Sequence, residues 1–439
     1  AAVDKGKAKC WGSNSAGQLG YGDDASRGTR VGDMGNSLPD IDLGSDSSVV
    51  NIWAGSLHTC ALLENHEVKC WGRNNHGQLG WTTAGGSHGK GSGDMGANLA
   101  SVDFGVSPDG PFVSDMALGK EHTCALFTDG TMKCWGINGW GHLGYGDQIA
   151  RGAAAGTMGT ALPPIDLGSG RTAVQISAGD KHSCALLDNK AVVCWGGDAQ
   201  GQTGRGGCGG SQCGDEPDEM GDNINGVDFG TSGKPVELKS GSLHSCAVLD
   251  DASVKCWGGN ANGALGYGDT EDRGLLPASM GEANWPKVDL GPNSQALHVG
   301  CAQHTCAVLN DGQVKCFGLN GNGMHGIGDA NEDQWGDEPG EMGSDLPTVL
   351  TMALTSTMTA STTTGTATDT HTTTMTAIDT TVTTAAALIA DTSGNGTDTT
   401  TMTTADDTDS QATISSAQSP GGGLAAPLAV VALAIWARL

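Results

Sequence analysis

The chain has 439 residues, and its 49 Asp and Glu residues outnumber its 22 Lys and Arg residues, which gives a formal net charge of −27. No Lys or Arg lies between Lys315 and Arg438. A surface that binds DNA or a nucleosome needs clustered positive charge. The composition therefore argues against a nucleic-acid partner.

From its first residues the chain repeats a short word, Cys-Trp-Gly or a close copy. It begins at Cys10, Cys70, Cys134, Cys194, Cys256 and Cys316, in steps of 60, 64, 60, 62 and 60 residues. Five copies follow a second word ("AGSLHTCALL", "LGKEHTCALF", "AGDKHSCALL", "SGSLHSCAVL", "GCAQHTCAVL"), whose cysteine lies ten positions before the next. Each copy precedes a Gly-rich run, a variable loop, "MG" and an apolar piece such as "LPDIDLG". A fixed period of this size indicates a repeat architecture.

The first repeat lacks its beginning. Counting ten positions back from Cys10 reaches the position just before Ala1. We therefore expect the chain to start inside a repeat, one residue after a missing cysteine. The lack of a signal peptide then says nothing about secretion.

Each repeat predicts a hairpin, of which "HTCALFTDGTMKCWG" is an example. Asp129-Gly130 is a strong turn signal. With Gly130 in the left-handed conformation, Phe127 faces Thr131 and Cys124 faces Cys134. Directly opposed residues lie about 4.5 Å apart at Cα, and a disulfide tolerates about 4.4–6.8 Å. The hairpin cysteines are therefore predicted to form disulfides: Cys60–Cys70, Cys124–Cys134, Cys184–Cys194, Cys246–Cys256 and Cys306–Cys316.

The whole unit predicts four short strands, around residues 174–178, 182–187, 191–195 and, in the preceding connection, 164–167. Repeated four-stranded sheets of this size indicate blades of a β-propeller. The stretches "ISAGDKHSCALLDNKAVVCWG" and "CWGSNSAGQLGYGD" resemble the regulator of chromosome condensation repeat. That resemblance implies an all-β propeller over residues 1–350, with about seven blades when complete and six repeat units visible in this chain. The fold is shared by the secreted β-lactamase inhibitor protein II. The chain departs from the family in its cysteines and in longer loops before "MG".

The remaining cysteines and the compartment follow from the same repeats. Cys208 and Cys213 share one Gly-rich loop and lie close enough to pair. Cys10 has lost its partner, and Cys301 is left over where other repeats carry Gly. Cytosolic proteins rarely hold so many disulfides, so we expect an oxidising destination. Buried free thiols are the alternative.

After the propeller, residues 351–420 contain 27 Thr and no apolar period. Such a stretch cannot bury a core and resembles a disordered, O-glycosylated stalk; a plain disordered tail is the alternative. Asn395 begins an N-glycosylation sequon. In the hydrophobic tail, residues 421–439, the 13-residue apolar run is short for a bilayer span. With Ser415 as candidate attachment site it fits a GPI signal; a marginal membrane tail and a meaningless apolar end are the alternatives.

Two residue patterns suggest a metal. The histidines two positions before a cysteine (His58, His122, His182, His244, His304) offer zinc-type ligands, but structural zinc takes four and a disulfide has no thiolate. The resemblance implies that this His is structural and hydrogen-bonded within its blade. Asp329, Asn331 and Asp333 have calcium-like spacing without the Gly and Glu of a calcium loop. We expect no cofactor, with Ca²⁺ as the weaker alternative, and no active site.

The sequence therefore predicts a non-enzymatic recognition propeller, secreted or displayed at the cell surface, with a protein or glycan ligand. Binding is expected in the variable loops, residues 81–94, 205–219 and 329–341, because variable loops on a rigid scaffold carry function. Trp81, Trp140 and Trp335 are candidate partner contacts, with packing between blades as the alternative. The resemblance also leaves open guanine-nucleotide exchange on a Ran-type GTPase and secreted enzyme inhibition.

Overall fold

The computed structural model describes residues 1–30, 32–45, 48–81, 85–206, 211–231, 233–276, 280, 285–327, 334–349, 375–377, 400–404 and 412–414. The described residues up to 349 belong to one compact unit, and those from 375 onward belong to a second.

The first unit is built from short strands. They are β1 (Ala2–Asp4), β2 (Lys7–Lys9), β3 (Val49–Ala54), β4 (His58–Leu63), β5 (Val68–Arg73), β6 (Ser87–His88), β7 (Val113–Leu118), β8 (His122–Phe127), β9 (Met132–Gly136), β10 (Ala173–Ala178), β11 (His182–Leu187), β12 (Val192–Gly197), β13 (Gln212–Cys213), β14 (Pro235–Ser240), β15 (His244–Leu249), β16 (Val254–Gly258), β17 (Ala296–Cys301), β18 (His304–Leu309) and β19 (Val314–Gly318). Single 3-10 turns lie between them: η1 (Gly35–Ser37), η2 (Gly96–Asn98), η3 (Gly159–Ala161), η4 (Pro217–Glu219), η5 (Gly221–Asn223) and η7 (Gly321–Gly323).

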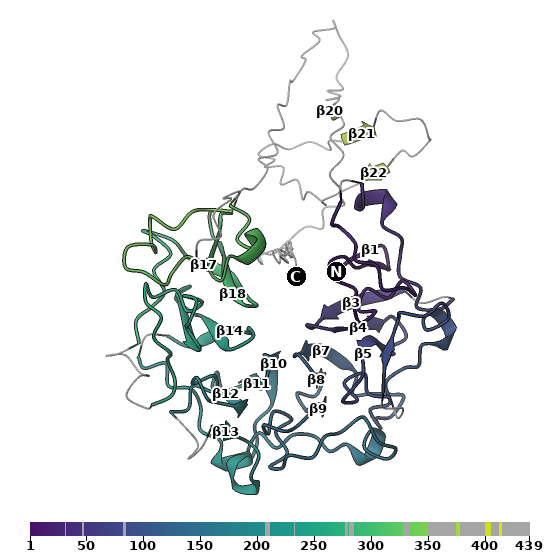
Figure 1. Ribbon diagram of the computed structural model, residues 1–439, viewed down its shortest axis with the longest axis horizontal. Coiled ribbons are helices and arrows are strands. Elements are labelled where there is room, and N and C mark those ends of the chain that lie inside the picture. The colour runs from purple at the N-terminus through teal and green to yellow at the C-terminus, as the bar shows by residue number, and fades with distance from the viewer. Residues whose placement is uncertain are drawn as a thin grey trace, which may run out of the picture. The chain divides into compact units, whose positions relative to one another are not determined.

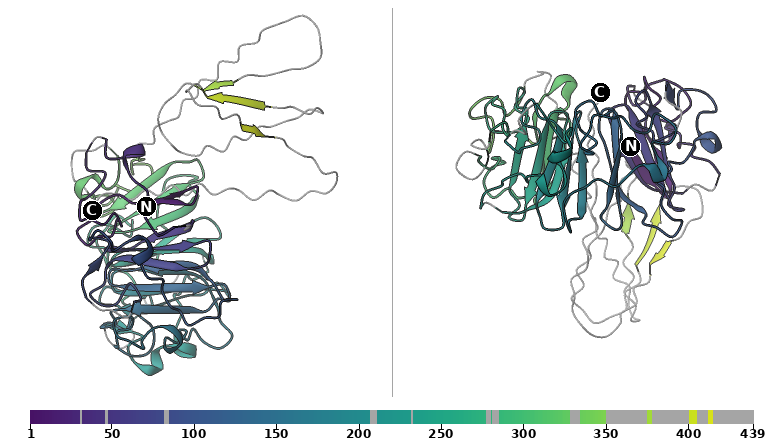
Figure 2. Two further views of the ribbon diagram at one scale, coloured as in Figure 1. Left: turned by 90° about the vertical axis from the view of Figure 1, so that its right-hand side faces the viewer. Right: turned by 90° about the horizontal axis from the view of Figure 1, so that it is seen from below.

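These strands form a β-propeller. Antiparallel sheets of order β3-β4-β5-β6, β7-β8-β9, β10-β11-β12-β13, β14-β15-β16 and β17-β18-β19 follow one another around a central axis (Figure 1). Seen from the side, their strands lie alongside one another, so that neighbouring sheets pack face to face (Figure 2). The first repeat contributes the two-stranded sheet β1-β2. The all-β propeller expected from the repeats is therefore confirmed.

The hairpin register predicted from "TDG" is confirmed. Cys124 pairs with Cys134 across β8 and β9, and the Phe127 amide donates to the Thr131 carbonyl at 2.9 Å. Gly130 has φ +80°, the left-handed conformation that closes the turn. The corresponding cysteines pair in the same register in the other four hairpins. A two-letter turn signal thus fixes which side chains face each other.

The predicted fourth strand at residues 164–167 is wrong. This segment is irregular, and its Ile165 amide donates to the carbonyl of Met132, the first residue of β9, at 2.8 Å. Pro163 and Pro164 lack amide donors, so the segment cannot form a continuous ladder there. In two sheets the fourth strand is instead the two-residue β6 or β13, which comes from the loop before "MG".

The core lies between neighbouring sheets. In one cluster Leu126 and Met132 of one hairpin pack with Ile176 and Leu187 of the next sheet. The aromatic residue of the second to sixth "CWG" words is fully buried at such a boundary (Trp71, Trp135, Trp195, Trp257 and Phe317), whereas Trp11 of the first word is half-buried. Because large side chains fill each boundary, the apolar core holds the blades side by side.

The "MG" word completes the contact between blades. The Gly96 amide donates to the Asp42 carbonyl at 3.0 Å, and a Cβ on Gly96 would meet the Asp42 carboxylate at 2.7 Å. Gly159 meets Asp103 in the same way. The glycine is required because the backbone approaches an aspartate of the preceding "DLG" or "DFG" piece.

The second unit contains β20 (Met375–Ala377), β21 (Thr400–Thr404) and β22 (Ala412–Ile414), which form one three-stranded sheet. The rest of the predicted Thr-rich stalk, including Asn395 and Ser415, lies outside the described residues, as does the hydrophobic tail. Within the described part of the chain no helix has the length and apolar character to cross a bilayer.

Candidate functional site

The structure bonds all five predicted hairpin pairs: Cys60–Cys70, Cys124–Cys134, Cys184–Cys194, Cys246–Cys256 and Cys306–Cys316. Their Cα atoms lie 4.0–4.1 Å apart, the closest approach of an antiparallel pair. Cys213 is also disulfide-bonded, and Cys208 lies outside the described residues. Among the described cysteines, Cys10 is a buried free thiol and Cys301 a half-buried one.

The repeated histidines connect blades, and the expectation of a hydrogen bond within one blade is wrong. His58 Nε2 lies 2.8 Å from Thr123 Oγ1 of the next blade. The Thr123 hydroxyl donates its proton to the Gln78 carbonyl, also at 2.8 Å. The hydroxyl must therefore accept, so His58 carries its proton on Nε2. The same contact joins His122 to Ser183, His182 to Ser245 and His244 to Thr305 at 2.8–2.9 Å.

These histidines are neutral. Desolvation by burial lowers the pKa of His58 and His182 to about 3 and that of His244 to about 4. A protonated ring at these places would be a buried charge with no counter-ion beside it. The histidines therefore act as fixed hydrogen-bond donors between blades.

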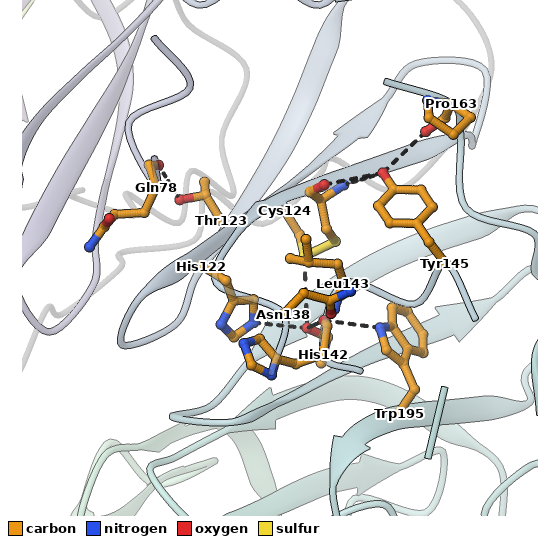
Figure 3. The surroundings of a disulfide bond; sticks show 12 residues. Gln78, His122, Thr123, Cys124, Asn138, His142, Leu143, Tyr145, Pro163 and Trp195 are labelled. Carbon is orange, nitrogen blue, oxygen red and sulfur yellow. Dashed lines mark hydrogen bonds between the residues drawn. A yellow bond between two sulfur atoms is a disulfide. The ribbon is translucent and has the colours of Figure 1, made fainter. Parts of the chain in front are cut away.

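At three boundaries one carbonyl, that of Gln18, Gln78 or His142, accepts from two donors. The His142 carbonyl accepts from the Ser183 hydroxyl at 2.9 Å and from Trp195 Nε1 at 3.2 Å. Figure 3 shows this arrangement around the Cys124–Cys134 disulfide, with His122 on one side and Tyr145 on the other. The Tyr145 hydroxyl donates to the Cys134 carbonyl at 3.1 Å. The sequence words "HSC", "CWG" and "LGYGD" are thus parts of one structural boundary.

One cluster of described side chains has the residue types of a metal site. In the described residues, His244, Cys246 and Cys301 place three potential ligand atoms within 4.8 Å of one another. Cys246 is in a disulfide and has no thiolate to give. The set falls short of the four ligands of structural zinc. Asp329, Asn331 and Asp333 lie outside the described residues.

The three candidate tryptophans are half-buried. Trp81 packs on two hydrophobic clusters and lies 4.5 Å from the His88 ring. Trp335 packs on another cluster. Lys181 Nζ lies over the Trp140 ring at 4.5 Å. Part of each ring is therefore used within the propeller, and their role as partner contacts stays a prediction.

A cavity of about 400 Å³ opens at one end of the propeller axis. The turns that join the inner strand of each sheet to its second strand line it, together with residues of the first repeat. We call these turns the axial mouth: residues 55–57, 119–121, 179–181, 241–243 and 302–303. Its volume lies within the range of about 300–1,000 Å³ found for ligand pockets.

The turns of the axial mouth share one backbone frame. The Gly55, Gly119, Gly179 and Gly241 amides each donate to the carbonyl of the histidine three positions later, at 2.8–3.0 Å. The last three turns are also bonded to each other, because the Asp180 amide donates to the Ser242 carbonyl at 3.1 Å and the Ser242 amide to the Ala302 carbonyl at 2.7 Å. The frame is thereby held by backbone contacts that do not depend on the displayed side chains.

The side chains shown on this frame differ from turn to turn. Between the glycine and the histidine the turns carry Ser-Leu, Lys-Glu, Asp-Lys and Ser-Leu, and the last turn carries Gln303. Lys120 pairs with Asp180 at 3.8 Å, and Arg73 with Glu121 at 3.4 Å. Burial raises the pKa of Asp180. The mouth thus offers charged, polar and apolar groups around one cavity.

The sequence analysis predicted binding in the long loops, which stays a prediction, and it did not identify this mouth. The sequence feature that could have revealed the mouth is the pair of residues between Gly and His, which differs between repeats while the Gly and the His stay the same in four of them. The alignment of Cys301 with glycine was also wrong. The last turn is one residue shorter, so that the Ala302 amide takes the role of the Gly241 amide and donates to the His304 carbonyl at 2.8 Å. Cys301, paired with Thr305, corresponds to Ser240, paired with Ser245.

Family models match the repeats directly. The regulator of chromosome condensation (RCC1) repeat matches residues 49–78, 113–141, 173–202, 236–264 and 302–323, and a second model of that description matches residues 129–186. Each matched segment of the first set carries part of one blade.

Similar proteins extend the match over most of the propeller. The chain is 25% identical over 323 residues to the ultraviolet-B receptor UVR8 of Arabidopsis thaliana, covering 73% of this chain and 62% of the receptor. It is 28% identical over 285 residues to the E3 ubiquitin-protein ligase HERC2 of Homo sapiens, covering 64% of this chain and 5% of the ligase. The chain thus spans less than two thirds of these relatives.

A solved structure shows the same fold. Yeast RCC1 (Prp20), in its crystal structure with Kap60, superposes with a TM-score of 0.57 at 22% identity, over 73% of this chain and 66% of that one. Propellers of this kind are commonly protein-binding modules. The repeat words, the blade register and these matches lead to one conclusion: the chain belongs to the regulator of chromosome condensation repeat family of β-propellers.

Proposed function

We propose that the chain is a non-enzymatic recognition propeller that works outside the cell and binds a protein partner at the axial mouth. The observation that carries this proposal is the mouth itself, where a common backbone frame displays different side chains around a cavity of about 400 Å³. Binding sites are commonly built from variable residues on a rigid scaffold.

Proteins of the same fold support a protein partner. The crystal structure of yeast RCC1 (Prp20) contains Kap60, and a second structure of Prp20p from Saccharomyces cerevisiae is described with its binding properties to Gsp1p and histones. The net charge of −27 opposes contact with the negatively charged backbone of a nucleic acid, but it does not oppose contact with a basic protein. We therefore assign the mouth a partner with complementary polar and apolar groups.

The disulfides support a location outside the cell. Five bonded hairpins in one domain are typical of an oxidising compartment and rare in the cytosol. The Thr-rich segment from residue 351 and the apolar end would serve as a stalk and an anchor at the membrane. With a signal peptide added, the protein should reach the cell surface and be released by a phosphatidylinositol-specific phospholipase. A surface protein that keeps residues 424–436 after this treatment would retain surface display but exclude the lipid anchor.

The experiment for the mouth compares two variants in a binding screen against secreted proteins and ectodomains. The mouth variant combines Leu57→Asp with Gln303→Asp, two residues that line the cavity from different turns. The control variant is Ile149→Asp, a 65% exposed residue of a blade-edge loop. We expect the mouth variant to lose the partner at least tenfold in affinity and the control to keep it.

Two results would contradict the proposal. Unchanged affinity of the mouth variant, with a normal melting temperature, would place binding elsewhere on the propeller. Binding confined to intracellular proteins, together with free alkylatable hairpin cysteines in the native protein, would exclude a function outside the cell.

A further inference from the structure

Cys301 is a free thiol beside a disulfide. It ends the inner strand β17 and lines the axial mouth. Its Sγ lies within 4.8 Å of the Cys246 Sγ, which belongs to the disulfide with Cys256 in the preceding blade. The Thr305 hydroxyl, across the strand pair from Cys301, lies 3.8 Å from the same Cys246 sulfur. A sulfur nucleophile and a disulfide sulfur therefore face each other across a blade boundary.

The other described boundaries between blades have the same backbone arrangement, but a residue other than cysteine stands at the position of Cys301. Leu118, Ala178 and Ser240 occupy the position of Cys301, because each pairs with the Ser or Thr that follows the repeated histidine. Ser183 Oγ lies 3.8 Å from Cys124 Sγ, the same distance as in the Cys301 boundary. The chain thus contains its own matched controls for this arrangement.

We propose that Cys301 exchanges with the Cys246–Cys256 disulfide. The Cys301 thiolate attacks the Cys246 sulfur, a Cys246–Cys301 bond forms, and the Cys246–Cys256 bond breaks. Cys256 leaves as a thiolate and takes up the proton that Cys301 gave to solvent. The number of disulfides and of thiols is unchanged, so no oxidant or reductant is required. The product links β15 to β17 and replaces a bond within one blade by a bond between two.

The rate of exchange depends on the thiolate of Cys301. Burial raises the pKa of this thiol to about 12, with hydrogen bonding from Thr305 acting in the opposite direction. The charged groups that face it are Lys239, which lowers the pKa, and Glu237, which raises it, both on β14. His244 on β15 is neutral and adds no charge. The thiolate is the nucleophile, so exchange is slow near neutral pH. Its rate rises about tenfold for each unit by which the pH is raised, up to about pH 12.

The test maps the linkages of the folded chain in the absence of reductant. A Cys10→Ser background removes the other described free thiol. The protein is incubated between about pH 7 and pH 9, quenched with acid, alkylated, and digested for mass spectrometry. We expect a Cys246–Cys301 linked peptide and alkylated Cys256, with a first-order rate that is independent of protein concentration and rises about tenfold per pH unit.

Three variants make the result decisive. Cys301→Ala, which copies Ala178, should remove the new linkage. Ala178→Cys in that background should transfer exchange to the next-but-one boundary, where the introduced thiol becomes linked to Cys124 and Cys134 becomes free. Cys256→Ser leaves Cys246 and Cys301 as two thiols, and oxidised glutathione added as the oxidant should join them into the same linked peptide and so prove that it can be detected. If the unsubstituted chain yields only Cys246–Cys256 at every pH, the proposal is wrong.

Discussion

A single histidine in each repeat carries a contact whose importance the sequence alone understates. His122 Nε2 donates to Ser183 Oγ at 2.9 Å, and the Ser183 hydroxyl donates to the His142 carbonyl at 2.9 Å. All three groups are buried. A buried donor left without its acceptor costs about 1–3 kcal/mol. The histidine is therefore a structural residue that reports on contact between blades.

A double-mutant cycle tests this contact. His122→Phe removes the donor, Ser183→Ala removes the acceptor, and the double variant removes both. We expect a coupling energy of about 1 kcal/mol or more in urea unfolding of the oxidised protein, because the two groups bond directly. The exposed His66, changed to Phe against the same Ser183→Ala, is the control and should show no coupling. Additive effects for His122 and Ser183 would show that the bond contributes nothing.

At the scale of the hairpin, the same left-handed turn position is filled by different residues. It is Gly130 in one blade and Lys190 in the next, with φ +80° and +69°. A Cβ on Gly130 would meet the Thr172 Cβ at 2.5 Å. A non-glycine residue in this region costs about 1–2 kcal/mol. The two turns therefore predict opposite responses to substitution.

Gly130→Val should lower the free energy of unfolding by about 2 kcal/mol or more, because a β-branched residue is strained at positive φ and also contacts Thr172. Lys190→Gly should leave stability unchanged or raise it by about 1 kcal/mol, since it removes the same strain. Both are measured by urea unfolding with the disulfides intact. Equal responses of the two turns would contradict the assigned conformations.

Each hairpin disulfide also belongs to this scale. Cys184 and Cys194 are ten residues apart, and closing a loop of that length stabilises the folded state by about 3 kcal/mol in the chain-entropy model. We expect Cys184→Ala with Cys194→Ala to lose about that amount in unfolding free energy. Recovery of full stability in the double variant would mean that the bond is dispensable.

For the whole molecule, the buried histidines make the folded state less stable as the pH falls below 6.5. His182 has a pKa of about 3 in the folded chain against an ordinary value of 6.5. Above pH 6.5 both states are neutral; below it the unfolded chain binds a proton that the folded chain does not. Each such histidine therefore reduces the free energy of unfolding by about 1.4 kcal/mol for each pH unit of acidification in this range. The contribution is complete above pH 6.5 and is lost as the pH falls towards 3.

His182→Gln provides the measurement. Between about pH 7 and pH 5 the parent should lose about 2 kcal/mol more than the variant, because the variant has no proton to take up at this position. Comparing the two proteins cancels the effect of the large negative charge, which weakens in acid. Parallel pH profiles would show that His182 does not titrate on unfolding.

The sequence predicted what depends on local pattern. The turn at Asp129-Gly130 specified the register, and the register specified the disulfides. Sequence reasoning failed for contacts between residues that are far apart in the chain and meet only in the folded structure. The partner of His58 lies 65 residues away in the next blade, and no periodicity announces it. Cys301 was misaligned because counting residues cannot detect a turn that has lost one, whereas its backbone hydrogen bonds do.

The axial mouth shows the same limit for function. Conspicuous tryptophans and long loops drew attention, but part of each tryptophan is spent on packing. The two residues between Gly and His are inconspicuous in sequence and gather only when the blades are arranged around the axis. A site made of one short turn from each repeat cannot be found in any single repeat.

Backbone bonds hold the mouth turns in addition to side-chain pairs such as Lys120–Asp180, so a displayed residue that makes no such pair can change without altering the turn. Selection can therefore rewrite one turn at a time, and each intermediate along the way still folds. A descendant of this chain could acquire a new partner by a few substitutions while its blades, disulfides and histidines stay as they are. The repeated framework is then inherited unchanged, while the residues displayed at the axial mouth evolve.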